Sequence, residues 1–183
     1  MGISGIGVLY RNTSSVEIEH RIYRWIRKVA SIIRVYEGSY GHGFGFYVRN
    51  GAIREFPDLR EFVGCRLTLT FSGIEADDVE LLTIESCVGY FPDGQIEISA
   101  GCNSLVDSIT ICEIACHIAS DLDGFIQLGG MIQRGMADAG GAAFHIPSLN
   151  AEGSYNYYTL VAPGFLMSLL SRSDFSRIVQ GWA

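Results

Sequence analysis

The alternation of apolar and polar positions follows a helical period most clearly between residues 104 and 130. Apolar side chains recur there at steps of three and four, and two neighbouring rows make the apolar face wide. These rows contain Leu105, Ile109, Ile111, Cys112, Ala115, Cys116, Ile118, Ala119 and Leu122. A narrow polar stripe remains, made of Asp107, Thr110, Glu113, His117 and Ser120 or Asp121. A helix this apolar is expected to lie across a sheet inside the protein. Asp123 and Gly124 then form a helix stop, and residues 125–128 predict a strand.

A second helix is predicted over residues 14–36. Ser14 and Glu17 have the spacing of a capping box, and the apolar residues behind them recur at alternating steps of four and three: Ile18, Ile22, Trp25, Val29 and Ile32. The outer face carries a basic stripe of His20, Arg24, Arg27 and Arg34, with Arg21 and Lys28 alongside. Such a stripe suits a phosphate or an acidic partner. A solvated face that pairs with carboxylates of the same chain is the simpler interpretation.

The remaining pattern is typical of strands. Residues 3–10, 38–48, 62–71, 143–146 and 155–161 predict strands, and residues 79–90 with 96–99 predict a hairpin around Pro92 to Gly94. Alternating glycines in residues 38–48 leave space for a bulky neighbour such as Trp25. Asn50 and Gly51 form a turn, and Pro163 begins a short helix over residues 163–170. Residues 133–142 predict a glycine-rich loop.

These elements predict an α+β fold in a single domain over residues 1–183. Three or four antiparallel strands precede the central helix. Two long helices, at about 14–36 and 104–121, pack on a mainly antiparallel sheet, and a short C-terminal helix follows.

The charges are distributed unevenly along the chain, which has a formal net charge of −7. No Lys or Arg lies between Arg66 and Arg134, although that interval is rich in Asp and Glu. We expect a region of negative potential there, which disfavours nucleic acid and favours a basic partner; a merely solvated acidic surface is the alternative. No secretion signal and no run of 18 apolar residues is present, and the five cysteines are an odd number. These features favour a reduced, cytoplasmic protein without a membrane span.

Metal binding is the first chemistry that the sequence invites. Cys112 and Cys116 share a helix face and His117 follows them. However, His117 points about 100° away from Cys116 on a helix, and no CxxC pair accompanies them. We therefore predict no metal ligands and no cofactor, and interpret both cysteines as core residues.

Catalysis has no complete motif. No GxSxG elbow is present, and the glycine-rich segment lacks the spacing of a phosphate loop. A Cys-His pair stays open, since Cys65, Cys87 or Cys102 can meet His42 or His145 in the fold. The alternative function is accordingly a small enzyme or ligand-binding domain. Its cleft would lie between the first helix and the glycine-rich strand, with His42 or His145 as acid or base.

The C-terminal half resembles an uncharacterised family of small bacterial proteins that look like the immunity proteins of polymorphic toxins. The resemblance spans roughly residues 103–179 and rests on these motifs: Asp123 to Gly130, Ile146-Pro147, Tyr158 to Val161, Pro163, Phe165-Leu166 and Asp174-Phe175. It implies a cytosolic protein that binds one cognate toxin and blocks it, and it agrees with an acidic patch that covers a basic active site. We therefore expect an inhibitor of this kind without catalysis of its own.

A partner-binding surface is predicted on this basis. Its acidic residues are Glu75, Asp77, Asp78, Glu80 and Asp93, and Arg134 and Asp138 of the glycine-rich loop lie at its rim.

Overall fold

A computed structural model describes residues 5–11, 14–38, 41–53, 62–74, 76–101, 104–129, 143–150 and 152–175. Its strands are β1 (Gly5–Tyr10), β2 (Ala30–Gly38), β3 (Gly41–Arg49), β4 (Phe62–Ser72), β5 (Gly94–Ala100), β6 (Phe125–Leu128), β7 (Ala143–Leu149) and β8 (Tyr155–Val161). Its helices are α1 (Ser15–Val29), α2 (Asp78–Val88), α3 (Leu105–Leu122) and α5 (Pro163–Leu170).

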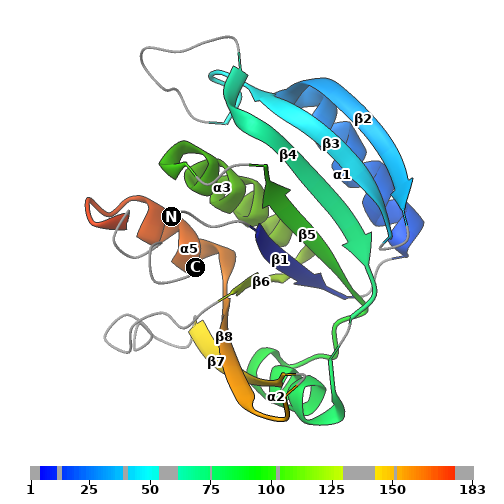
Figure 1. The fold of residues 1–183 in the computed structure, drawn as a ribbon, viewed down its shortest axis with the longest axis vertical. Coiled ribbons are helices and arrows are strands. Elements are labelled where there is room, and N and C mark those ends of the chain that lie inside the picture. Colours follow the sequence, from blue (N-terminus) through cyan, green and yellow to red (C-terminus); the bar gives the residue numbers. More distant parts are fainter. Residues whose placement is uncertain are drawn as a thin grey trace.

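All eight strands belong to one sheet in the order β2-β3-β4-β5-β1-β6-β8-β7 (Figure 1). Every neighbouring pair is antiparallel. The fold is thus α+β with an antiparallel sheet, as the sequence predicts. Five strands of the described chain precede α3: β2 occupies residues that the pattern predicts to be helical, whereas residues of the predicted strand 79–90 form α2.

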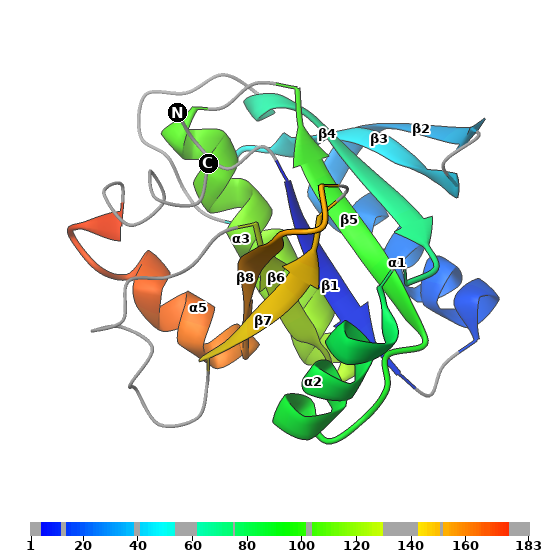
Figure 2. The same ribbon diagram turned by 60° about the horizontal axis from the view of Figure 1, so that its bottom comes forward.

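The helices cover the two faces of the sheet unequally. Apolar residues of α1 and α3 share one core with inward residues of β1, β3, β4, β5 and β6, and α5 packs on α3 at the same side. α2 lies on the opposite face, where Ile84 joins a second cluster with Leu9, Ile146 and Leu160 (Figure 2). The rest of that second face is polar: Gln95, Glu97 and Gln127 line a shallow hollow there.

α3 confirms the central helix and its stop. Ser104 and Asp107 form a full capping box, and Asp123 adopts a left-handed conformation with φ of 51° just before β6. The predicted polar stripe divides into two parts, however. Asp107, Thr110 and Glu113 are buried, whereas His117, Ser120 and Asp121 are exposed. Only the C-terminal half of α3 therefore presents polar groups to solvent.

α1 is shorter than the predicted helix at 14–36. It ends at Val29, and Ala30 is already extended at φ −117° and ψ 149°. Residues 30–38 are rich in β-branched and aromatic side chains, and they pair with β3 as the edge strand β2. Ile32 continued the helical spacing by coincidence, so the pattern alone did not reveal the boundary. The side chains that α1 buries completely in the core are Ile18 and Ile26, and Trp25 lies at the margin.

α2 corrects the predicted strand at 79–90. Asp77 is the N-cap, since its side chain accepts a hydrogen bond of 2.8 Å from the backbone N–H of Glu80, and Gly89 ends the helix with φ of 82°. The hairpin expected around Pro92 is therefore a helix followed by β5. The pattern misled because α2 leaves apolar residues exposed, as described below.

The glycines of β3 leave space on the polar face of the sheet. A methyl group at Gly43 would overlap the carbonyl oxygen of Leu69 and approach the hydroxyl of Tyr36, and one at Gly45 would meet the guanidinium of Arg66. The bulky neighbours are thus Tyr36 and Arg66, and the predicted contact with Trp25 is wrong. The turn at Asn50 and Gly51 is confirmed, with Gly51 at φ 72°.

The last part of the chain agrees closely with the pattern. β7 and β8 are present as predicted and pair with each other, although β7 extends beyond residue 146 through Pro147 to Leu149 as an edge strand, and α5 occupies Pro163–Leu170. The predicted loop at 133–142 lies outside the described residues.

Candidate functional site

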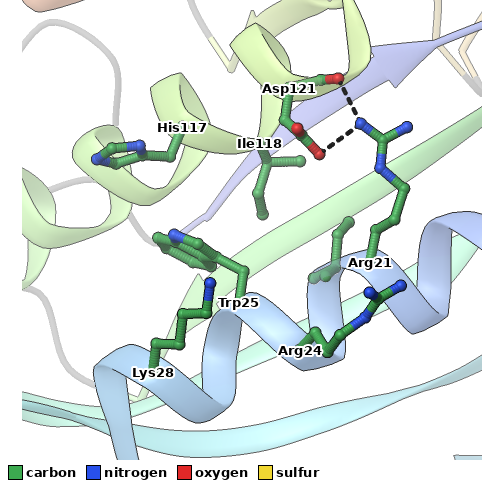
Figure 3. Close-up of a pocket in the computed structure, with 8 residues that line it drawn as sticks. Arg21, Arg24, Trp25, Lys28, His117, Ile118 and Asp121 are labelled. Carbon is green, nitrogen blue, oxygen red and sulfur yellow. Dashed lines mark hydrogen bonds and ion pairs between the residues drawn. The ribbon is translucent and has the colours of Figure 1, made fainter.

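A pocket of about 350 Å³ lies between α1 and the C-terminal half of α3. Arg21, Ile22, Arg24, Trp25 and Lys28 approach it from α1, and His117, Ile118 and Asp121 approach it from α3 (Figure 3). We call this set the basic pocket, because three of its side chains are cations and one is a carboxylate. Its volume is in the range of small-molecule sites.

Two contacts between the helices shape the basic pocket. Arg21 donates hydrogen bonds to the Asp121 side chain at 2.8 Å and to the Asp121 backbone carbonyl at 2.9 Å (Figure 3). On the other side, the Trp25 indole packs against the His117 imidazole, with ring centroids 5.5 Å apart. These contacts join α1 to α3 on two sides of the basic pocket (Figure 3).

Arg24 and Lys28 are the cations of the pocket without such a contact. Both side chains are exposed, and within the described residues neither forms an ion pair with a carboxylate. They lie four residues apart on α1, so they share one side of the helix. The residues of the basic stripe therefore differ in their pairing. Arg21 pairs with an acid of its own chain, whereas Arg24 and Lys28 pair with no carboxylate in the part of the chain that the structure describes.

The two histidines of the alternative hypothesis occupy different places. His42 on β3 binds Glu19 of α1 through Nε2 at 2.9 Å and stacks on Phe71. His145 on β7 contacts the Thr159 hydroxyl through Nδ1 at 3.2 Å, and its Nε2 is buried without a hydrogen-bond partner among the described residues. β3 and β7 lie near opposite ends of the sheet, and neither histidine lines the basic pocket.

The cysteines of α3 are core residues. Cys112 is fully buried, and burial raises the pKa of its thiol well above the ordinary value. Burial, helped by the charge of Glu113, raises the pKa of Cys116 to about 12, and its thiol donates to the carbonyl of Pro163. Such thiols stay protonated and make poor metal ligands. Among the described residues, no group of His, Cys, Asp or Glu is arranged to hold a metal ion.

The predicted acidic surface is only partly assembled. Asp77, Asp78 and Asp93 are exposed, but Glu80 is only 7% exposed and accepts a hydrogen bond of 2.8 Å from the Tyr158 hydroxyl. Glu80 thus fastens α2 to β8 and does not present its carboxylate to solvent. Glu75, Arg134 and Asp138 lie outside the described residues, as does Cys102.

Basic residues of the first sixty positions neutralise part of the acidic region. Arg21 pairs with Asp121, and Arg11 lies 3.6 Å from Asp123. The acids at the start of α2 are therefore a better candidate surface than those at the end of α3.

The outer side of α2 exposes apolar side chains to solvent. Val79 and Leu82 are one turn apart and remain 52% and 59% exposed, and Asp78 precedes them. We call Asp78, Val79 and Leu82 the α2 face. Exposed apolar residues next to charged ones are typical of protein-binding surfaces.

Sequence reasoning missed the basic pocket as a site, although its components were visible. One usable signal is Trp25, which follows Arg24 directly and precedes Lys28 by three residues. A second is His117 in the polar stripe of the central helix. What the pattern did not contain was the packing of α1 beside α3, which brings Trp25 and His117 together. The α2 face was missed because residues 79–90 were assigned to a strand, although Asp77 and Glu80 have the spacing of an N-cap signal.

Comparisons with known proteins locate the chain in one family. Among curated proteins and among solved structures, no match was found. Among the described residues, no helix combines the length and the apolar character needed to span a membrane. A family model matches residues 5–179, which extends well beyond the C-terminal half that carries the sequence motifs. The chain therefore belongs to DUF6368, a family of unknown function.

Proposed function

We propose that this protein is a cytoplasmic inhibitor that binds a cognate secreted bacterial toxin and occludes its active site, without catalysis of its own. The observation that carries the proposal is the α2 face, where Val79 and Leu82 stay exposed next to Asp78. The sequence motifs of the C-terminal half, which resemble an uncharacterised family that looks like immunity proteins, favour the same function.

The α2 face has the composition of a binding surface. Single exposed apolar residues are common, but two on adjacent turns of one helix, next to carboxylates, form a small apolar centre with a polar rim. Asp77 and Asp78 lie at the N-terminal end of α2, and the helix contains no Lys or Arg. A basic toxin surface would therefore meet acids and apolar side chains together.

The side of α2 that faces the sheet is both packed and hydrogen bonded. Ile84 is buried in a cluster with Leu9, Ile146 and Leu160, and Glu80 is bonded to Tyr158. A helix fixed in this way loses little conformational entropy on binding, which favours affinity. The buried residue of the predicted acidic set, Glu80, thus supports the exposed ones on α2.

The proposed function is tested with the toxin encoded by a neighbouring gene. We expect the wild-type protein to copurify with that toxin and to protect cells that express it. The double variant Asp78→Lys and Leu82→Asp leaves the N-cap Asp77 intact and is expected to weaken binding by at least about 30-fold, since residues central to an interface contribute roughly 2 kcal/mol or more.

A matched control carries the same changes elsewhere. Glu152→Lys and Val35→Asp alter a carboxylate in the β7–β8 turn and an apolar residue on the edge strand β2, both of which are exposed and lie outside the α2 face. This control is expected to bind and protect like the wild type. If the α2 double variant binds as tightly as the control, the surface assignment is wrong. If wild-type protein neither binds the toxin nor protects against it, the inhibitor function is wrong.

A further inference from the structure

The basic pocket contains cations for which the fold has no evident use. Arg24 and Lys28 lie at i and i+4 on α1, and like charges at that spacing repel each other. Among the described residues, neither is paired with a carboxylate, although the protein carries a formal net charge of −7. Arg21, by contrast, is fixed by two contacts with Asp121. Arg24 and Lys28, two cations beside one pocket, are therefore suited to an anionic ligand.

The aromatic wall of the pocket supplies a second kind of contact. The Trp25 indole is half-buried and rests against the His117 ring, which limits its freedom (Figure 3). Figure 3 shows Lys28 beside Trp25 and Arg24 on the next turn toward Arg21. An indole held in this way offers a planar surface for a second ring. Ile22 and Ile118 add apolar surface to the same pocket.

We propose that the basic pocket binds a small phosphorylated aromatic ligand of the nucleotide class. Its phosphate contacts Arg24 and Lys28, and its ring packs against Trp25. A phosphate monoester carries a charge of about −1.5 to −2 at neutral pH, which matches two cations better than a single carboxylate does. A pocket of about 350 Å³ between two helices accommodates a mononucleotide, and the negative charge of the whole protein disfavours a polyanion. This binding is independent of any toxin.

The experiment uses tryptophan fluorescence with AMP as the probe. The chain has two tryptophans, and Trp182 lies outside the described residues. In a Trp182→Phe variant the signal comes from Trp25 alone. We expect AMP to change this signal saturably, and adenosine and inorganic phosphate each to bind at least about tenfold more weakly, because each lacks one of the two recognised groups.

Two variants locate the binding. In the same background, Arg24→Gln with Lys28→Gln is expected to raise the Kd for AMP by at least about tenfold, because hydrogen bonds to charged groups are lost. Arg27→Gln is the matched control, since Arg27 is exposed on the same helix but does not line the pocket. Its Kd is expected to stay within about twofold of the parent, as for other surface substitutions.

Four results would overturn the proposal. The first is the absence of a saturable signal with millimolar AMP. The second is equal affinity for AMP and adenosine, which would leave the cations without a role. The third is an unchanged Kd in the Arg24 and Lys28 double variant, which would place the site elsewhere. Tighter binding of a single-stranded oligonucleotide than of AMP would likewise contradict a mononucleotide pocket.

Discussion

The hydrogen bond between Tyr158 and Glu80 makes a direct test of how α2 is held on the sheet. Both residues are buried, and the hydroxyl donates to Oε1 at 2.8 Å. Burial, with the hydrogen bond to the Glu80 carboxylate, raises the pKa of Tyr158, so the hydroxyl remains the donor. Tyr158→Phe removes this donor and leaves the carboxylate buried. Because hydrogen bonds to charged groups contribute about 1.5–3 kcal/mol, we expect the free energy of unfolding to fall by roughly 2–3 kcal/mol.

The assay is urea unfolding followed by circular dichroism, with thermal melting as a second measurement. For a chain of this length, a loss of about 2–3 kcal/mol lowers Tm by roughly 4–12 °C. Tyr157→Phe is the control, because Tyr157 directly precedes Tyr158 and is 50% exposed. The loss of its hydroxyl should change the free energy of unfolding by less than about 0.5 kcal/mol.

A second variant separates the hydrogen bond from the charge. Glu80→Gln keeps an acceptor oxygen for Tyr158 and removes the buried charge, so it should cost less than Tyr158→Phe does. If Tyr158→Phe and Tyr157→Phe unfold at the same urea concentration with the same slope, the bond contributes nothing measurable. The account of how α2 is fastened to β8 would then be wrong.

Three further predictions concern local features of the fold. Ser104→Ala should lower the unfolding free energy by about 1 kcal/mol, because it removes the capping box of α3; an unchanged urea midpoint would contradict this. Gly43→Ala should cost about 3 kcal/mol or prevent folding, since its methyl would overlap a backbone carbonyl, while Gly73→Ala, with open space around it, should melt near the wild type; equal melting would refute the overlap. Burial raises the pKa of the Cys112 and Cys116 thiols above the ordinary 9.0, so the stability that depends on their protons is complete below pH 9 and is lost as pH rises toward about 12. Replacing both cysteines by Ala should make Tm fall less steeply as pH rises above 9. If Tm falls equally steeply in the variant and the wild type, the direction of the pKa shift is wrong.

The parts of the fold that could be predicted are those whose pattern is local. α3 was visible because its apolar spacing runs from Leu105 to Leu122 and ends at a turn signal. α5 was visible because Pro163 starts an apolar run directly after a strand. In both cases propensity, pattern and capping agree, and such agreement specifies an element well.

The misses have a different physical origin. α2 was assigned to a strand because its exposed Val79 and Leu82 broke the amphipathic pattern of a helix. β2 was hidden because Ile32 kept the spacing of α1 beyond the point where the backbone becomes extended. The basic pocket needs the packing of α1 beside α3, and the spacing along either helix does not encode that distance. The α2 face and the basic pocket, to which our two proposals refer, thus lie where the local pattern does not determine the structure.

The central position of β1 affects the order in which the chain can complete its sheet. β1 is synthesised before its two neighbours in the sheet, β5 and β6, which come from residues 94–128. By contrast, β2, β3 and β4 are neighbours both along the chain and in the sheet, so they can pair early. Contacts between segments this far apart in sequence slow folding. Until the ribosome has released residue 128, the nascent chain carries an apolar strand that lacks at least one of its two partners, and an exposed strand of this kind is prone to aggregate.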